Sequence, residues 1–191
     1  MATLNAANAL MFGSSNDSIS LGPAGTNIDT ITGLSAALPA GLTDAGWINE
    51  DGLALNLSDS VDRIRGHQNH GVVKTFVSDS TTTLDVTLLE SKLQTLQTYF
   101  DATAEKVADG EADIAKFTVP SARKVKQLVG VVDAFDTSNE DIQWRLVFPH
   151  LELGERDNLS LKVGEITAWH YQMEVLDKFY LISNSPAMLT A

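Results

Sequence analysis

The sequence predicts a mainly β fold, an antiparallel β-sandwich or barrel of about eight strands with one flanking α-helix. Several segments alternate apolar and polar residues with a period of two, which is typical of strands with one buried face. One segment, residues 91–100, instead has apolar residues three and four positions apart, as a helix requires. Residues 1–40 and 182–191 show neither period and are predicted to be extended arms.

The composition fits a folded acidic protein and excludes several functions. The 191 residues include 13 basic and 25 acidic side chains, for a net charge of −12, and 43% are hydrophobic. No basic residue precedes Arg63, although binding to duplex DNA needs basic groups against the phosphates. The lack of cysteine excludes disulfides, thiolate metal sites and cysteine nucleophiles. No apolar run is long enough to span a membrane, so we expect a protein made and kept in a cytosol, or assembled there.

Residues 1–40 differ from the rest because they are rich in Ala, Asn, Ser, Thr and Gly. Their only charges are Asp17 and Asp29. A stretch of this length without a pattern is either disordered or ordered by a partner surface. We interpret it as an N-terminal arm, with a short strand expected at residues 28–34.

Two hairpins are predicted next. Asp51-Gly52 supplies the positive φ of a tight turn, so residues 46–49 and 52–58 are expected to pair around it. Residues 72–78 and 81–89 are expected to pair around residues 79–80, with one apolar and one polar face. The apolar face consists of Leu84, Val86 and Leu88, and the polar face of Thr81, Thr83, Asp85 and Thr87. The connection between the hairpins, residues 58–71, is interpreted as a long mobile loop.

The helix is expected to begin with a capping box, in which the side chains of Ser91 and Gln94 each bond the other residue's backbone. Its apolar stripe is Leu93, Leu96 and Phe100. The pattern leaves open whether the helix ends near Phe100 or runs to residue 107.

Strand patterns return after the helix, at residues 114–119, 125–135, 142–148 and 166–176. In the last of these, Trp169, Tyr171, Met173 and Val175 share one face. Pro149 has no N–H to donate, so the strand before it is expected to end there or to lie at an edge.

No group of residues predicts catalysis. His67 and His70 have the spacing of a helical metal pair, but Gly66 and Gly71 place them in a loop without a third ligand. The acidic pairs Glu50-Asp51, Glu140-Asp141 and Glu155 with Asp157 occur at turns, where carboxylates are solvated. Neither a nucleophile elbow nor a phosphate-binding glycine loop is present. We therefore expect neither an enzyme nor a cofactor.

Part of the chain resembles the major tail (tail tube) proteins of long-tailed, non-contractile phages of actinobacteria. The resemblance lies in residues 42–53 (LTDAGWINEDGL), in the loop, and in residues 81–89 followed by residues 90–100. In that family a G-Y/W-I-x-E-D-G hairpin, a strand ending in L-L-E and a short helix ending in aromatic residues follow in this order. The likeness covers about residues 40–150. The sequence departs from the family in having Trp47, where Tyr is frequent, and in its Ala/Asn-rich N-terminal arm.

The resemblance implies a β domain over residues 41–181 and a structural role in the virion. Such proteins form hexameric rings that stack around a tape-measure protein, contact tail-tip and terminator proteins, and later let double-stranded DNA pass without specific binding. The long loop after the first hairpin bridges subunits and rings. By position, that loop here includes Ser58, Asp59, Asp62, Arg63, Arg65, His67 and His70.

Two other functions stay open. A β-sandwich binding module, such as a carbohydrate-binding or adhesin-like domain, would use exposed Trp47, Trp144 or Trp169 as a stacking platform, although the last two are expected in the core. A head decoration protein is a further structural alternative. For a conduit, acidic residues on strands or turns are expected to face the channel and repel DNA.

Overall fold

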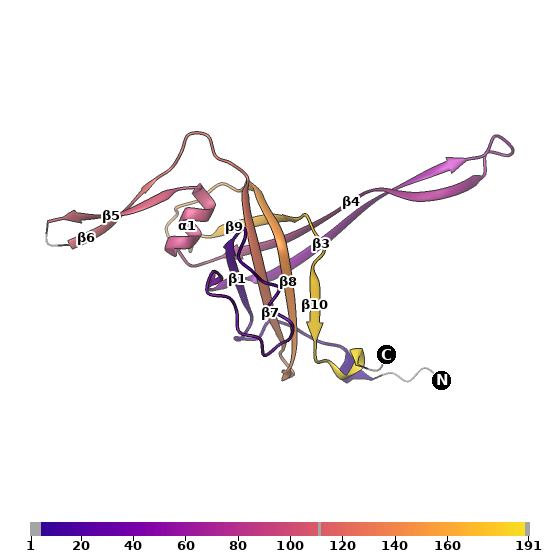
Figure 1. Cartoon of the computed structure of the whole chain (residues 1–191), viewed down its shortest axis with the longest axis horizontal. Helices are drawn as coiled ribbons and strands as arrows, with labels where there is room; N and C mark the ends of the chain where they lie inside the picture. The colour runs from indigo at the N-terminus through magenta and orange to yellow at the C-terminus, as the bar shows by residue number, and fades with distance from the viewer. Residues whose placement is uncertain (1–4, 111, 190–191) are drawn as a thin grey trace.

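The computed structural model describes residues 5–110 and 112–189, and within them the fold is mainly β, with every strand pair antiparallel (Figure 1). The main sheet contains β1 (Ser18–Pro23), β2 (Thr43–Asp44), β3 (Ile48–Arg65), β4 (Val72–Leu88), β7 (Lys126–Asp136), β8 (Asn139–Arg156), β9 (Trp169–Val175) and β10 (Tyr180–Ser183). A second sheet pairs β5 (Thr103–Asp109) with β6 (Ala112–Thr118), and α1 spans Leu93–Phe100. Short 3₁₀ turns lie at Ala6–Asn8 and Pro186–Met188. This agrees with the predicted mainly β class with one α-helix. No helix among the described residues is long and apolar enough to cross a membrane.

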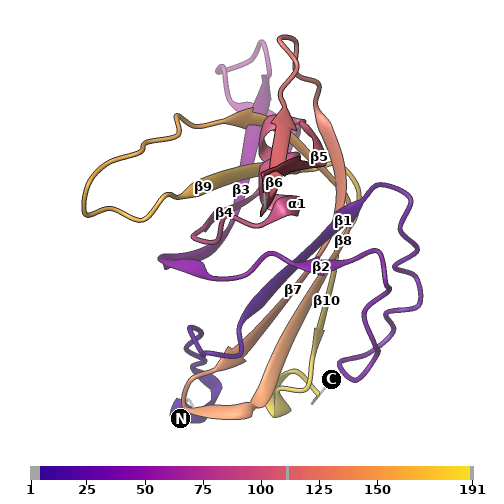
Figure 2. The same ribbon diagram turned by 90° about the vertical axis from the view of Figure 1, so that its left-hand side faces the viewer.

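Strand β8 is where the main sheet divides. The strand order is β2-β1-β7-β8-β9-β4-β3, and β10 also pairs with β8. Along one side of β8 the partner is β10 at residues 144–147 and β9 from residue 151 onward. The sheet bends here, so that β9, β4 and β3 cross over β1, β7 and β8 (Figure 2). The two halves enclose the main core between them.

Pro149 does not end β8, contrary to the prediction. Phe148 pairs with Gly130 and Leu151 with Leu128, so two residues of β8 oppose one residue of β7. Pro149 therefore lies in a β-bulge, and it also lies where the second partner changes from β10 to β9. A bulge tolerates a residue without an N–H because the ladder is already interrupted there.

The main core confirms the predicted alternation in two strands. Leu84, Val86 and Leu88 of β4 are buried, whereas Asp85 and Thr87 between them remain partly accessible. Trp169, Tyr171 and Met173 of β9 are buried on the same side, and the intervening residues face outward. Across the core they meet buried side chains of β1, β7 and β8: Ile19, Leu21, Leu128, Val132, Phe148, Leu151 and Leu153.

The outer face of β7 and β8 carries a second, smaller core. Val129, Val131 and Val147 are covered by Ile28 and Ile31 from the segment 24–42. This segment runs over the sheet rather than away from it. It therefore hides an apolar face that would otherwise meet water.

A buried ion pair fastens this covering segment. Arg145 lies opposite Asp133 in the β7–β8 ladder, and its Nε and Nη2 donate to the two carboxylate oxygens at 2.7 and 2.9 Å. Arg145 Nη1 donates to the carbonyls of Gly33 and Ala36, at 3.1 and 2.9 Å. Four of the five N–H donors of the guanidinium are thus used, which offsets the cost of burying the charge.

The expected strand at residues 28–34 is absent, and the strand in this part of the chain is β1, at Ser18–Pro23. β1 pairs with β7 over its whole length, and Ile19 and Leu21 enter the core. Residues 18–23 therefore have regular structure without a partner molecule, contrary to our interpretation. The short run ISL is too brief to show a period, and the ladder of β7 determines its conformation.

The helix ends at Phe100, one of the two predicted limits, because Asp101 adopts the left-handed conformation (φ 53°) and closes it. The capping box is wrong. Lys92 is the N-cap and has no side-chain cap bond, while Ser91 Oγ accepts from Trp169 Nε1 at 3.3 Å and Gln94 Nε2 donates to Leu21 O at 2.8 Å. These side chains tie the helix to the sheet instead of to itself.

The predicted apolar stripe of the helix is only partly right. Leu93 is exposed, and Leu96 and Phe100 lie at the margin of the core. Tyr99 is the deeply buried contact, with its ring 5.3 Å from Trp169 and 5.7 Å from Tyr171 between centroids. Tyr171 donates to Thr95 O at 2.8 Å, and burial raises the pKa of this tyrosine. The aromatic contacts place the helix across β9.

The hairpin predicted around Asp51-Gly52 is also wrong, since β3 runs without a turn from residue 48 to residue 65. Ile48 pairs with Leu88 and Leu53 with Val86, so the residues between them form a bulge in which Gly52 has φ +74°. The positive φ was correctly expected, but it serves a bulge. Likewise, β4 continues through residues 79–80, and β3 and β4 form one long hairpin.

Glu90 holds the start of β3. Its Oε1 accepts from the N–H of Trp47 at 2.9 Å, and its Oε2 lies 3.1 Å from Lys92 Nζ. The backbone donor first, and then the lysine, keep the pKa of Glu90 below its ordinary value. The ionised carboxylate therefore stabilises the folded state at neutral pH.

Removing the guanidinium in Arg145→Met leaves the carbonyls of Gly33 and Ala36 without this donor, and it leaves the buried Asp133 carboxylate without its cation. Among the described residues, only the Gln143 side chain, at 2.8 Å, then still donates to that carboxylate. We expect the free energy of unfolding to fall by about 3–5 kcal/mol, measured by urea denaturation. Exposed Lys178→Met is the control for losing one positive charge. The double variant Arg145→Met/Asp133→Leu should recover part of the loss. A single variant with the wild-type midpoint would show that the pair does not hold the covering segment.

Glu90→Gln should destabilise the protein in a pH-dependent way. Because the pKa of Glu90 is lower in the folded than in the unfolded chain, its contribution is fully present above about pH 4.5 and is lost as pH falls through the folded-state pKa. Urea unfolding of wild type and variant between neutral pH and about pH 3 should show curves that converge on the acid side. Glu155→Gln, an exposed carboxylate, is the control. A pH-independent difference between the curves argues against the ionised contact.

Candidate assembly surfaces

The most prominent surface is an arm formed by residues 57–82, where β3 and β4 pair only with each other and leave the body of the sheet (Figure 1). β9 reaches only as far as Thr83 on β4. Beyond this point almost every arm residue is exposed. An isolated two-stranded ribbon is at best marginally stable in water. Within the described chain, the arm therefore has neither a third strand nor a covering layer.

The interpretation of residues 58–71 as a mobile loop is wrong in its structure. Ser58, Asp59, Asp62, Arg63 and Arg65 lie on β3, and only residues 66–71 form the turn. His67 and His70 lie in that turn. All seven residues are exposed and lie along one continuous ribbon, with none in a closed site. Their predicted role in contacts between subunits stays a prediction.

The turn at the end of the arm is closed by backbone geometry. Gly66 N donates to Gly71 O at 2.9 Å, and Arg65 Nη1 donates to His70 O at 3.1 Å. Asn69 and His70 have φ of 59° and 51°, the left-handed region that Asn and His enter more readily than most residues. Among the described residues, no group of three or more His, Cys, Asp or Glu could hold a metal ion.

Apolar side chains lie on both faces of the arm, which sequence reasoning missed. Val61 and Val77 are cross-strand partners on one face, whereas Ile64 and Phe76 lie on the other. All four are exposed. The signal was the β-branched run in residues 72–77, but a bulge at Ser78 shifts the register and could not be located in advance. An arm with two apolar faces fits between two covering surfaces.

Charge is unevenly divided along the arm. From residue 63 to residue 78 there are three basic residues, Arg63, Arg65 and Lys74, and no acidic one. The chain as a whole has a net charge of −12, so this segment, here called the basic tip, is opposite in sign to its surroundings. Asp59, Asp62 and Asp79 are confined to the half of the arm nearer the body.

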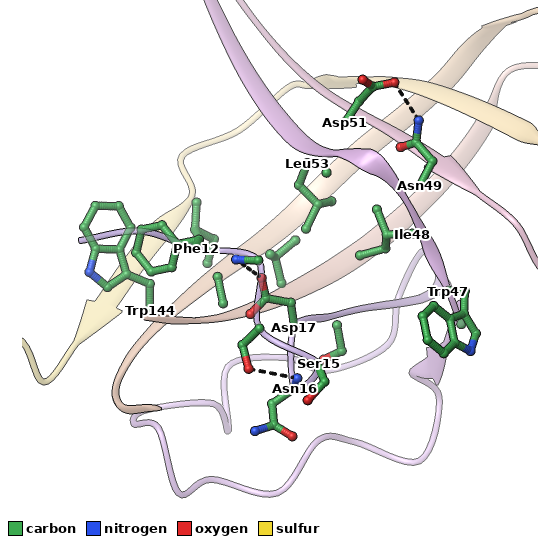
Figure 3. Close-up of a pocket in the computed structure, with 18 of the residues that line it drawn as sticks. Phe12, Ser15, Asn16, Asp17, Trp47, Ile48, Asn49, Asp51, Leu53 and Trp144 are labelled. Atoms are coloured by element: carbon green, nitrogen blue, oxygen red, sulfur yellow. Dashed lines mark hydrogen bonds between the residues drawn. The ribbon is translucent and has the colours of Figure 1, made fainter. Parts of the chain in front are cut away.

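A groove of about 1040 Å³ opens between the two halves of the sheet (Figure 3). Its walls are apolar, formed by β3 on one side and β7 and β8 on the other. Phe12 and Trp144 close one end, with their rings 4.9 Å apart, and Trp47 stands at the opposite end (Figure 3). The apolar lining consists of Phe12, Trp47, Ile48, Leu53, Leu55, Leu84, Val132, Ala134, Trp144, Leu146 and Phe148.

Acidic residues surround the groove. Asp17, Asp44 and Glu90 are engaged within the chain: Asp17 accepts from two backbone N–H groups, and Asp44 and Glu90 contact Lys92. Glu50 and Asp51 are exposed at the rim, next to the bulge of β3. Asn49 Nδ2 donates to Asp51 at 2.7 Å (Figure 3). No lysine or arginine belongs to the lining.

The tryptophans differ in their surroundings. Trp169 is buried, as predicted. Trp144 is only half-buried and belongs to the groove wall, and Trp47 is 75% exposed. They do not share a flat face, so they form no common stacking platform.

The other acidic pairs of the sequence are occupied at the surface. Glu140 accepts from Ser14 and Asn16, and Asp157 Oδ2 lies 2.7 Å from His170 Nδ1. Neither pair lines the groove. Among the described residues, these two carboxylates therefore take part in surface contacts away from the groove.

The sequence model of the phage tail tube protein family matches residues 3–184. No curated protein matches the chain. In a structure described as the cryo-EM structure of the anti-feeding prophage baseplate, 6-fold symmetrised, one chain is 12% identical, with a TM-score of 0.44 over 95% of this chain and 97% of its own length.

The assignment rests on the sequence match, which includes the arm, both walls of the groove and the helix. This chain belongs to the phage tail tube protein family.

Proposed function

We propose that the protein is the major tail tube subunit of a long-tailed, non-contractile phage of the actinobacterial type, and that it stacks as hexameric rings to form the conduit for double-stranded DNA. Membership in the tail tube family makes it a structural component of the virion and not an enzyme. The finer assignment is supported by the likeness of residues 40–150 to the actinobacterial proteins. The conduit requires no cofactor.

The observation that carries the proposal is the arm. Its apolar residues lie on both faces, and no part of the described chain covers them. Burying both faces would stabilise the ribbon by about 25 cal/mol for each Å² of apolar surface removed from water. Neighbouring subunits can supply such cover. The predicted contact residues, Ser58 to His70, lie along this ribbon and are the proposed contacts between rings and subunits.

The edges of the sheet support ring formation. β3 lies at one end of the strand order and is 18 residues long, whereas β2 at the other end has only 2. A long unpaired edge is a template for another strand. Pairing of β3 with the β2–β1 edge of the next subunit would join the sheets of one ring into a continuous barrel.

The acidic charge suits a conduit for DNA. Like charges on the wall and on the phosphates prevent adhesion, and counterions and water fill the space between them. We propose that acidic strand or turn residues face the channel. The further partners are the tape-measure protein during assembly and the tail-tip and terminator proteins at the ends of the tube.

The wild-type chain should form rings or tubes with a central opening, seen by negative-stain electron microscopy and by sedimentation over a range of concentrations. Addition of the tail-tip proteins tests whether growth needs an initiator. A chain that stays monomeric at every concentration, with and without them, contradicts the proposed function.

The arm is tested by replacing residues 61–78 with Asn-Gly. Ser60 and Asp79 are cross-strand partners, so the new two-residue turn closes the hairpin without changing its register. The variant should keep a thermal midpoint within about 4 °C of wild type, since the residues removed contribute little to the core. It should form no stacked tubes.

A second variant separates the length of the arm from its apolar faces. Val61, Ile64, Phe76 and Val77 are changed to Thr, which keeps the strand propensity and removes the apolar surface. We expect stacking to fail as in the shortened arm. The matched control changes Ser58, Ser60, Ser78 and Ser80 to Thr on the same arm, and should assemble as wild type. Tubes of normal length from the arm-less chain would contradict the proposed role.

A further inference from the structure

We propose that the basic tip of the arm, residues 63–78, docks into the acid-rimmed groove of a second copy of this chain. The inference rests on the proposed function and specifies the acceptor surface for the arm. The inference follows from the shape, polarity and charge of the groove and the basic tip, which complement each other. The groove is concave and apolar with an acidic rim, and the tip is a narrow apolar ribbon with basic residues.

The tip does not reach the groove of its own chain. Leu53 and Leu55 of β3 line the groove, and the same strand then runs without a turn to Arg65. A paired β-strand advances about 3.3 Å per residue, so the tip begins roughly 25 Å or more from the groove wall. Figure 1 shows the arm pointing away from the body. The occupant must therefore come from another molecule.

The apolar surfaces match in character. Ile64, Val72 and Val73 are exposed at the tip, with Val73 72% exposed. The groove presents aliphatic and aromatic side chains on both walls and is open to solvent. A two-stranded ribbon is one sheet layer thick, and a layer packs about 10 Å from the sheet that it covers, so the ribbon can lie over the groove with its apolar side chains directed into it. Docking removes both apolar surfaces from water, and this supplies most of the driving force.

The unpaired charges of the tip and of the groove rim are opposite in sign, and this favours binding of one to the other. Arg63 and Lys74 make no ion pair with any described residue, and Arg65 donates only to a carbonyl of its own turn. Glu50 and Asp51 at the groove rim likewise contact no lysine or arginine there. Opposite charges at the margin of an apolar contact steer association and disfavour other registers.

Other exposed elements fit the groove less well. The β5–β6 hairpin has its charges paired across its strands, Lys106 with Asp113 and Lys116 with Glu105. The β8–β9 connection exposes Leu161, Val163 and Ile166, and its Lys162 pairs with Glu165. Residues 119–125 also expose Val119 and Val125 beside Arg123 and Lys124, which make no ion pair with a described residue. That segment contains no strand, whereas the tip is a paired ribbon that projects from the body (Figure 1).

The test is a charge exchange in the full-length chain. Variant A changes Arg63, Arg65 and Lys74 to Glu, and variant B changes Glu50 and Asp51 to Lys. Variant AB carries both sets, which reverses each side of the contact and restores attraction. The control, C, changes Asp29 and Glu155 to Lys, two exposed acids outside the groove, and so alters net charge as B does. All five chains are first compared by thermal unfolding, because folded variants alone report on docking.

The readout is the lowest concentration at which stacked tubes appear, by sedimentation and negative-stain microscopy at low and high salt. A and B should each raise this concentration about tenfold or more, which corresponds to about 1.4 kcal/mol. AB should return to within about threefold of wild type, and C should stay near wild type. High salt should weaken the wild-type contact and reduce the penalty in A and B.

The outcomes separate the acceptor from the function. Tubes from B at the wild-type concentration overturn the groove as acceptor. Loss of assembly in B but not in A means that a different segment occupies the groove. If AB needs as high a concentration as A to form tubes, the tip docks elsewhere. Either result overturns the inference and leaves the tail tube function intact. A wild-type chain without tubes under all conditions instead contradicts the proposed function itself.

Discussion

The valine-rich strand β7 buries residues on both of its faces, Val132 toward the main core and Val129 and Val131 toward the smaller one. A strand of this kind needs a layer on each side. The inner layer is supplied by β4, β9 and the helix, and the outer one by segment 24–42. Because that cover is irregular chain, its carbonyls need donors, and Arg145 supplies two of them while paired with Asp133. The position of the N-terminal segment therefore depends on one strand and one buried ion pair.

The same sheet leaves two apolar surfaces exposed in the monomer, the arm and the groove. The arm, residues 57–82, has no third strand, because β9 pairs with β4 only from Thr83 onward. Its apolar residues stay exposed on both faces. The groove is a second apolar surface, concave and open to solvent, between the two halves of the sheet. A folded body with an uncovered apolar ribbon and an apolar groove gains stability when association buries these surfaces, as self-assembly into a tube requires. A net charge of −12 makes free subunits repel one another, and the proposed docking of the basic tip would set a local attraction against that repulsion.

The functional assignment draws on both kinds of information. Residues 3–184 match the tail tube family, and the structure adds where assembly contacts are available. The residues predicted for the contact between subunits, Ser58 to His70, were located by resemblance, and they lie on the arm. The sequence had no means to indicate the groove, because its walls come from β3, β7 and β8 and from the chain around Phe12. These segments are far apart in the chain.

The sequence by itself determined the mainly β class, the alternation of Leu84, Val86 and Leu88 and the buried face of β9, since each depends on residue type or on neighbours within a few positions. Only the tertiary structure decided how the strand segments join. Asp51-Gly52 forms a bulge in one strand, Pro149 lies in a bulge of β8, and residues 18–23 extend along β7. Ser91 and Gln94 bond the sheet instead of capping the helix. In each case a partner distant in sequence offers more hydrogen bonds and more buried surface than the local alternative, and a local pattern carries no information about that partner.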